Sequence, residues 1–235
     1  MTQHRKRTVI LISGRGSNMA ALIEAAEDSA FPAEIVGVIS DKADAGGLQL
    51  AAAKGIATRI VSRGDFASRQ AHDDAIDAEL AGFGAEIVCL AGYMRILTPA
   101  FVERWQGRMI NIHPALLPSF KGLDTHARAL AAGQRIHGCT VHFVTPEMDD
   151  GPIIAQSAVP VLIGDDEQAL SARVLKAEHE LYPMALRLVA EEKARMEGGR
   201  TVFSNFEAPD QGGTLTSPGP ADKPIDLEAL ARITP

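Results

Sequence analysis

The chain has 235 residues, which suits one large domain or two small ones, and 46% of them are hydrophobic. Its 30 acidic and 23 basic residues give a net charge of −7, so the chain as a whole lacks the basic footprint of a nucleic-acid-binding protein. Cys89 and Cys139 form neither a zinc pattern nor a secreted disulfide framework, which favours a reducing cytoplasm. No apolar run suits a membrane span or a signal peptide, so we expect no membrane partner.

Short apolar runs alternate with alanine-rich helical segments through residues 8–144. The strands are predicted at 8–13, 34–40, 59–61, 86–92 and 108–113, and the helices at 17–27, 48–55, 67–81 and 100–105. Because these strands are apolar throughout, they are expected to be covered on both faces. The pattern predicts an α/β fold with a Rossmann-like open twisted sheet, mostly parallel, and helices on both faces.

The pattern changes near the C-terminus. Strands at 138–145 and 151–161 are joined only by the PEMDD turn, so they must be antiparallel, and the C-terminal part of the sheet is predicted to be mixed. A long helix follows the acidic segment 164–167, and we expect it to be broken or kinked near Pro183. Residues 1–203 are predicted to form a single domain. The Pro- and Gly-rich tail 204–235 is expected to be extended or partly disordered, with one or two helical turns at 226–232.

The segment SGRGSN (13–18) follows the first strand and opens the first helix. Helix N-termini bind anions through free N–H groups and the helix dipole. Gly16 allows close backbone approach, and Ser17 and Asn18 can add side-chain donors. The third glycine of a dinucleotide fingerprint and the lysine of a Walker loop are both missing, which favours a phosphate monoester over NAD or ATP. A tight turn without a ligand is the alternative.

Polar residues end the fifth predicted strand. Asn111 and His113 are two positions apart, so their side chains share one face at the carboxyl end of the strand, where open α/β sheets bind ligands. An imidazole beside a carboxamide combines a proton acceptor with an oxyanion donor. The alternative is an ordinary hydrogen-bonded histidine. Asp149 and Asp150 lie in a turn that could reach the same edge, where a carboxylate would stabilise the imidazolium of His113; solvated turn residues are the alternative.

Other kinds of site are less favoured. A metal site from His113, His126 and Asp149 is conceivable, whereas His137 and His142 are expected on opposite sides of one strand. A serine nucleophile would need a G-x-S-x-G elbow, which the chain lacks.

Four segments in chain order resemble the single-domain, folate-dependent phosphoribosylglycinamide formyltransferase family of purine biosynthesis: ISGRGSN, CLAGYMRIL, NIHPALLPSFKGLDTHARAL and GCTVHFVTPEMDDGPIIAQ. The resemblance covers about residues 8–203. It implies a transfer of the formyl group from 10-formyltetrahydrofolate, a co-substrate, to the amine of glycinamide ribonucleotide, with no metal. The N-terminal part, about 8–105, would bind phosphate, and the part at about 106–203 would bind folate and carry the catalysis. The family also suggests a homodimer.

The resemblance implies roles for individual residues. Gly16, Ser17 and Asn18 would hold the substrate phosphate, and Glu178 would contact the ribonucleotide. The folate pocket, with main-chain groups reading the pterin, would be lined by Arg69, Met94, Arg95, Ile96, Leu97 and Asn111.

The catalytic residues implied are Asn111, which would bind the formyl oxygen, His113, which would act in proton transfer, and Asp149, which would hold and charge the histidine. Transfer would be direct, through a tetrahedral intermediate. Which group moves each proton stays open. The departures from the family are Arg15 in the glycine loop, Asp124 at a position that the family varies, and the tail after about Ser204.

Three other functions are alternatives. A 10-formyltetrahydrofolate hydrolase would use a similar site with water as the acceptor, but known relatives carry an added N-terminal regulatory domain. A formyltransferase acting on initiator tRNA would need a C-terminal nucleic-acid module. A noncatalytic sugar-phosphate binder would keep its role without His113.

Overall fold

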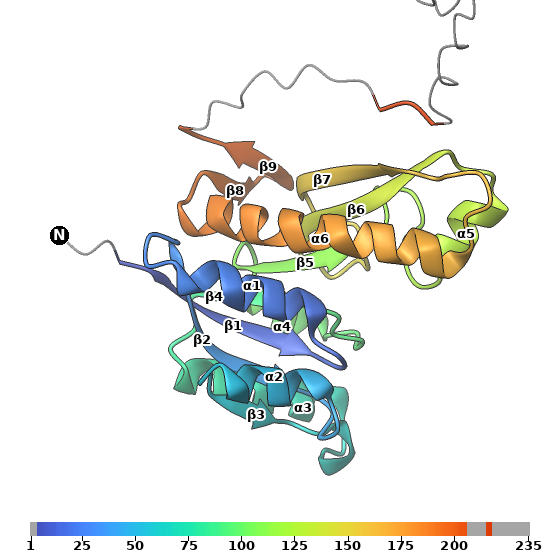
Figure 1. Ribbon diagram of the computed structural model, residues 1–235. Helices are drawn as coiled ribbons and strands as arrows, with labels where there is room; N and C mark the ends of the chain where they lie inside the picture. Colours follow the sequence, from blue (N-terminus) through green and yellow to red (C-terminus); the bar gives the residue numbers. More distant parts are fainter. Residues whose placement is uncertain (1–3, 206–214, 218–235) are drawn as a thin grey trace, which may run out of the picture.

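The structure is a computed structural model, and it describes residues 4–205 and 215–217. The elements follow one another in this order (Figure 1): β1 Lys6–Ile12, α1 Ser17–Glu27, β2 Ala33–Ser40, α2 Gly46–Ala53, β3 Thr58–Ile60, a short 3-10 helix Arg63–Asp65, α3 Arg69–Gly82, β4 Ile87–Leu90, α4 Pro99–Arg104, β5 Met109–His113, α5 Thr125–Ala131, β6 Ile136–Phe143, β7 Ile153–Pro160, α6 Glu167–Ala190, β8 Ala194–Glu197 and β9 Arg200–Phe203.

Seven strands form one sheet in the order β3-β2-β1-β4-β5-β6-β7. Neighbouring strands from β3 to β5 are parallel, whereas β6 runs antiparallel to both β5 and β7. The chain starts at β1, moves outward through β2 and β3, and resumes at β4 on the other side of β1. The strand order therefore reverses between β1 and β4, and open α/β sheets bind ligands outside the carboxyl ends of the strands at such a point.

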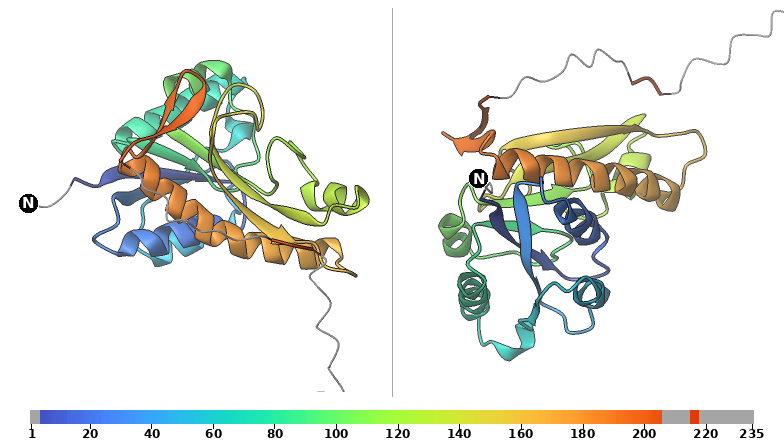
Figure 2. Two further views of the ribbon diagram at one scale, coloured as in Figure 1. Left: turned by 90° about the horizontal axis from the view of Figure 1, so that it is seen from above. Right: turned by 60° about the vertical axis from the view of Figure 1, so that its left-hand side comes forward.

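Helices cover both faces of this sheet (Figures 1 and 2). Along β1, Ile10 and Ile12 pack into the core beneath α1, α2 and α6, whereas Val9 and Leu11 pack into a second core beneath α3 and α4. Successive residues of a strand point to opposite faces, so an unbroken apolar strand supplies both cores. The predicted α/β fold, with a mostly parallel sheet and an antiparallel C-terminal part, is confirmed.

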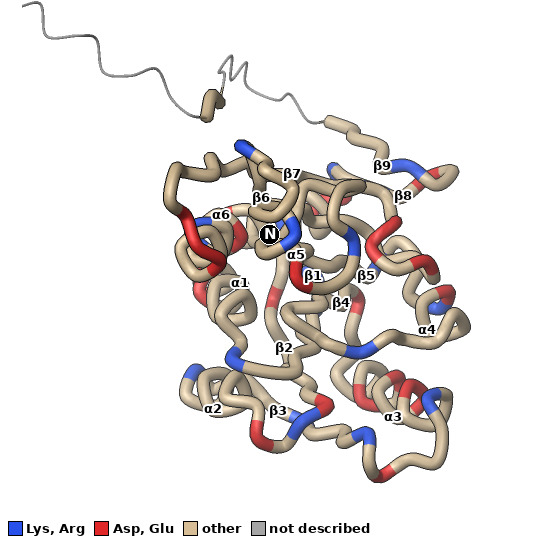
Figure 3. Tube along the Cα trace, turned by 90° about the vertical axis from the view of Figure 1, so that its right-hand side faces the viewer, with Lys and Arg blue, Asp and Glu red and all other residues tan. Residues whose placement is uncertain are grey.

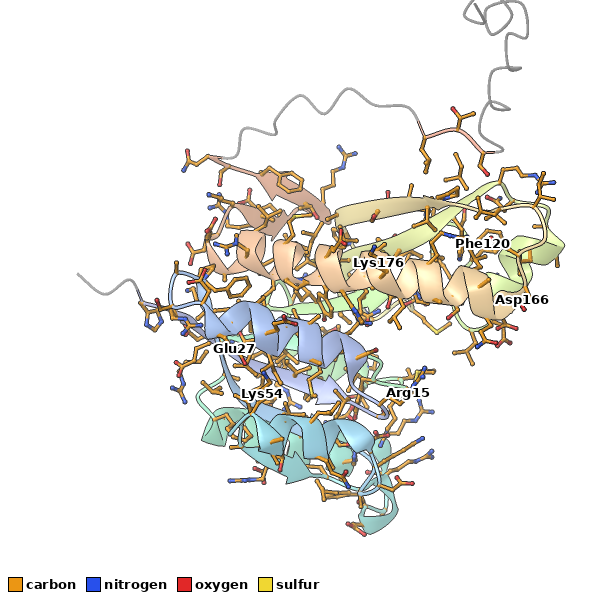
Figure 4. All side chains as sticks on the ribbon, in the orientation of Figure 1. Arg15, Glu27, Lys54, Phe120, Asp166 and Lys176 are labelled. Atoms are coloured by element: carbon orange, nitrogen blue, oxygen red, sulfur yellow. The ribbon has the colours of Figure 1, made fainter. Side chains whose placement is uncertain are left out.

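Ion pairs join neighbouring elements on the surface. Lys54 Nζ lies 2.7 Å from Glu27 Oε1 and connects the end of α2 to α1 (Figure 4), and Arg104 Nη2 lies 3.0 Å from Asp74 Oδ1 and connects α4 to α3. Basic and acidic positions are interspersed along the trace (Figure 3). Within the described ranges, no helix is long and apolar enough to cross a membrane.

Of the two outcomes predicted near Pro183, the break was wrong, because α6 runs from Glu167 to Ala190 as one helix with Pro183 inside it, whereas the kink stays a prediction. Its N-cap is Asp166, whose side chain accepts a hydrogen bond from the Ala169 N–H. The residue before the proline, Tyr182, is fully buried, and its hydroxyl donates to the carbonyls of Leu90 and Ile110 in the sheet. Tertiary packing on both sides of the proline therefore outweighs the loss of one helical hydrogen bond.

The sequence analysis did not predict two elements, one helix and one hairpin. The helix α5 begins after Asp124, and the β8–β9 hairpin turns at Gly198 and Gly199, which both have positive φ. A Gly-Gly pair between two short segments is a hairpin signal, and it was present in the sequence at 198–199. The helical turns expected at 226–232 lie outside the described residues.

Candidate active site

The loop between β1 and α1 surrounds a small hollow at the start of a helix. Gly16 has φ 76°, and a Cβ there would lie 2.9 Å from the Cα of Gly47, so the position requires glycine. No side chain in the described part of the protein caps α1, which leaves its first N–H groups open to a ligand. A cavity of about 130 Å³ lies here, lined by residues 14–18, Ala91 and Gly92. The size of the hollow and the N–H groups at the start of α1 suit a small anionic group.

Glu178 lies beside this hollow although it is 160 residues away from Asn18 in the chain. It projects from α6, is 5% exposed, and accepts a hydrogen bond of 2.7 Å from Asn18 Nδ2 to its Oε2. Burial raises the pKa of the Glu178 carboxyl, and the hydrogen bond from Asn18 opposes part of that rise. Arg15 is exposed on the same loop (Figure 4). The structure thus brings Glu178 to the predicted phosphate loop.

The segment 94–97 follows β4 and borders the reversal point of the sheet. The Met94 N–H donates to Ser13 Oγ at 2.9 Å, and the Thr98 N–H donates to Asp73 Oδ2 at 2.7 Å. Ser13 follows β1, and Asp73 is fully buried in α3. The segment is therefore fixed at both ends by side chains from two other elements.

The side chains of this segment divide between surface and interior. Met94 and Ile96 are each 63% exposed, whereas Leu97 is buried. Arg95 Nη1 donates to Nδ1 of buried His72 at 2.7 Å, so its guanidinium points inward. The exposed apolar side chains of Met94 and Ile96 suit contact with an apolar ligand.

Arg69, which the resemblance also assigns to this pocket, is the first residue of α3 and is exposed. The same helix carries His72 one turn later, so α3 brings its first turn close to the 94–97 segment.

Asn111 and His142 lie next to each other on neighbouring strands of the sheet. They are paired residues of β5 and β6, and Asn111 Nδ2 lies 3.2 Å from His142 Nε2. The other ring nitrogen, Nδ1, lies 2.8 Å from the Phe143 carbonyl, which can only accept, so Nδ1 carries the proton and Nε2 accepts from Asn111. Burial is the main cause that lowers the pKa of His142, in agreement with a neutral ring. This arrangement fixes the carboxamide through one of its two N–H groups, and the described residues give the second N–H no hydrogen-bond partner.

His113 is held at both ring nitrogens. It is 5% exposed, its Nε2 lies 2.9 Å from the Phe120 carbonyl, and its Nδ1 lies 3.4 Å from Asp149 Oδ2. Since a carbonyl only accepts, Nε2 carries a proton. The same carboxylate oxygen accepts a hydrogen bond of 2.9 Å from the Gly122 N–H. Asp149 itself has φ 51°, an unusual backbone conformation for a residue that is not glycine.

The structure therefore gathers the predicted catalytic residues Asn111, His113 and Asp149 at one end of β5 and β6. It adds His142, which sequence analysis missed because a local pattern does not reveal which residue pairs with Asn111 across the sheet. Asp149 Oδ1 lies 3.9 Å from His142 Nε2, but that nitrogen carries no proton, so we do not assign an ion pair to this contact. Among the described residues, no group of three or more His, Cys, Asp and Glu side chains is placed to hold a metal ion. Asp124, one of the departures from the family, is the N-cap residue of α5 and has φ 55°.

Comparisons with known proteins agree with this geometry. Residues 6–186 match the formyl transferase family. The chain is 44% identical over 204 residues to the phosphoribosylglycinamide formyltransferase of Escherichia coli (strain K12), covering 87% of this chain and 96% of that protein. A crystal structure of phosphoribosylglycinamide formyltransferase from Brucella melitensis is 61% identical, with a TM-score of 0.77 over 79% of this chain and 96% of that chain.

The similarity extends to larger proteins. The chain is 50% identical over 200 residues to the trifunctional purine biosynthetic protein adenosine-3 of Bos taurus, covering 85% of this chain. It spans only 20% of the length of that relative. The match to the formyl transferase family and the near-complete overlap with the bacterial relatives show that the chain belongs to the phosphoribosylglycinamide formyltransferase family.

Proposed function

We propose that the protein transfers the formyl group of 10-formyltetrahydrofolate to the amine of glycinamide ribonucleotide in purine biosynthesis. The observation that carries this proposal is the convergence of Asn111, His113 and Asp149 beside an anion hollow, in a chain of this family. The two halves of the site supply what the reaction needs, an anchor for a phosphate and a set of proton-transfer groups.

The ribonucleotide is placed by its phosphate and its amine. Gly16, Ser17 and Asn18 would hold the phosphate in the hollow at the start of α1. Glu178, hydrogen-bonded to Asn18, would contact the glycinamide portion. Burial raises the pKa of the Glu178 carboxyl, so an additional hydrogen bond from an incoming amine or amide N–H group would stabilise its charged form.

The folate would lie against the segment 94–97. Exposed Met94 and Ile96 offer apolar contact, and Leu97 supports the segment from below. The anchors at Ser13 and Asp73 hold the main chain in place, so that its N–H and C=O groups can read the pterin edge. Arg69 and Asn111 complete the proposed pocket.

The chemistry follows from the charges that develop. Attack of the amine on the formyl carbon forms a C–N bond and a tetrahedral centre with a negative oxygen and a positive nitrogen. The free N–H of Asn111 and the imidazolium of His113 would stabilise the oxygen. The attacking nitrogen loses a proton, the folate nitrogen gains one, and the C–N bond to folate breaks. His113 and Asp149 would mediate this proton transfer, with no covalent enzyme intermediate.

We also propose the organisation and setting of the protein. Residues 1–203 would form the single formyltransferase domain, with the phosphate-binding part at about 8–105 and the folate and catalytic part at about 106–203, and 204–235 would be an appended tail. A cytoplasmic location is supported by Cys89 and Cys139, which are both free and buried. A homodimer stays a prediction from the family.

The test is a formyl-transfer assay on purified protein with 10-formyltetrahydrofolate, run with and without glycinamide ribonucleotide. We expect folate turnover that depends on the ribonucleotide and yields its N-formylated form. Equal turnover without the ribonucleotide would instead indicate a hydrolase. If neither condition gave turnover while the ribonucleotide still bound, a noncatalytic sugar-phosphate binder would replace the proposal.

A further inference from the structure

The backbone segment 118–124 lies over His113 in an arrangement that the reaction chemistry alone does not require. Phe120 provides the carbonyl that accepts from His113 Nε2, and it does so with φ 56°. A bulky residue rarely adopts the left-handed region, and it keeps such a conformation only where its surroundings hold it there.

Arg128 holds the segment from α5. Its Nη1 donates to the carbonyl of Lys121 at 2.6 Å and to that of Leu123 at 3.2 Å. Its guanidinium lies 5.5 Å from the centre of the Phe120 ring, within the range of a cation–π interaction. The exposed Arg128 thus contacts both the backbone that follows Phe120 and the ring of Phe120 itself.

An ion pair connects the same segment to the turn that carries Asp149. Lys121 Nζ contacts Asp150 Oδ1, and the neighbouring Gly122 N–H donates to Asp149 Oδ2. Lys121 follows Phe120 and Asp150 follows Asp149. The Phe120 carbonyl and the Asp149 carboxylate contact the two ring nitrogens of His113. The Lys121–Asp150 ion pair connects the residues that directly follow these two.

We propose that the Phe120 carbonyl sets the tautomer of His113, and that Arg128 and the Lys121–Asp150 ion pair are positioning residues that keep this carbonyl in place. Nε2 keeps its proton on the Phe120 carbonyl, so the proton that His113 exchanges is the one on Nδ1. The imidazolium donates that proton toward Asp149 Oδ2, 3.4 Å away, and the neutral ring is left with its lone pair on Nδ1. The role in catalysis rests on the proposed function, whereas the tautomer does not.

The first measurement is the tautomer itself. The full chain, labelled with ¹⁵N-histidine, gives ¹⁵N shifts that distinguish a protonated nitrogen from an unprotonated one, and His113→Gln assigns the signals. We expect neutral His113 to be protonated at Nε2 in the wild type and to become a mixture of tautomers in the Arg128→Met Lys121→Met double variant. A wild-type ring protonated at Nδ1, or an unchanged Nε2 tautomer in the double variant, would overturn the proposal.

The second measurement is steady-state formyl transfer at low ionic strength. Arg128 and Lys121 are partly or fully exposed, so their variants are expected to fold. Each single variant should lower kcat about two- to fivefold, the scale of an exposed charged contact, with the KM values for both substrates nearly unchanged. Exchanging the charges in Lys121→Asp Asp150→Lys should restore most of the loss from Lys121→Met. Restoration of nothing, or a rise in KM alone, would contradict a positioning role for the pair.

Matched controls come from the other half of the molecule. Arg59 lies 5.4 Å from the centre of the Phe83 ring and donates to a backbone carbonyl, as Arg128 does, and Lys54 pairs with Glu27 as Lys121 pairs with Asp150. Arg59→Met and Lys54→Met should leave both kcat and the His113 signals unchanged. Inactive wild-type protein would count against the proposed function, while the tautomer measurement would still decide the role of the Phe120 carbonyl.

Discussion

The two halves of the sheet build their parts of the site in different ways. At the carboxyl end of β1, the anion hollow consists of backbone, one required glycine and the start of a helix. At the end of β5 and β6, the polar site consists of side chains, His113, Asn111 and Asp149, held by groups far away in the sequence. The first half can bind a charge without titrating, and the second contains the groups that can move protons. Binding and chemistry can therefore be disturbed separately.

The sharpest separation is expected from the catalytic side chains. Asn111→Ala, His113→Ala and Asp149→Asn should each lower kcat by about 10²–10³, the typical loss when one oxyanion donor or proton-transfer group is removed. The KM for the ribonucleotide should change little, because its phosphate is held in the other half. Steady-state kinetics measure both constants. Near-wild-type rates in all three variants would remove these residues from the catalytic site.

Acid should destabilise the second half in particular. Burial lowers the pKa of His126 and His142, and lowers that of His137 to about 4. Between pH 6.5 and about 4, the unfolded chain binds a proton at His137 that the folded chain does not, so the free energy of unfolding falls as the pH falls. The slope approaches about 1.4 kcal/mol per pH unit for one such group. Urea titrations at a series of pH values measure how the free energy of unfolding depends on pH. His137→Gln should reduce this pH dependence, and the control His4→Gln, at an exposed histidine, should not.

The hollow in the first half should respond through affinity. In Gly16→Ala, the left-handed conformation costs about 1–2 kcal/mol, and the added Cβ would meet the backbone of Gly47 at 2.9 Å. We expect the KM for the ribonucleotide to rise about tenfold or more, on the scale of that free energy. The KM for the folate should stay near its wild-type value. Gly133→Ala is the matched control, because Gly133 has a similar left-handed φ of 67°, a Cβ there would meet nothing within 4 Å, and it does not line the hollow. Equal KM values in the two variants would contradict the role of the Gly16 turn.

The same contrast explains what the sequence could predict. The boundaries of α1 and the location of the anion hollow follow from local signals, a strand, a glycine loop and a helix start. Asn111 and His113 could be placed on one face because the period of a strand is local as well. The contacts of His142 with Asn111 and of Phe120 with His113 depend on strand register and on a left-handed backbone residue, which no local pattern specifies. The continuity of α6 through Pro183 likewise depends on packing of Tyr182 against the sheet.

Glu178 on α6 contacts Asn18 in the phosphate loop, and of the effects predicted here the change in stability on its substitution should be the smallest. The pKa of its carboxyl is raised in the folded chain, so the folded state holds the proton more tightly than the unfolded state. The contribution of this bound proton to the free energy of unfolding is fully present below the unfolded pKa of about 4.5 and is lost as the pH rises through the folded pKa. Glu178→Gln keeps the hydrogen-bonding oxygen that Asn18 needs and removes the buried charge.

At pH 7, Glu178→Gln is therefore expected to raise the Tm by about 2–4 °C, the shift that ~1 kcal/mol produces in a chain of this size. Below pH 4.5 the difference in Tm should vanish, because both side chains are then neutral. The ribonucleotide KM should rise in the same variant, since an amide is a weaker acceptor than a carboxylate for an amine or amide donor. Thermal melts at the two pH values, with kinetics at pH 7, measure both effects. A more stable variant with unchanged affinity would show that Glu178 is buried beside the hollow without contacting the substrate.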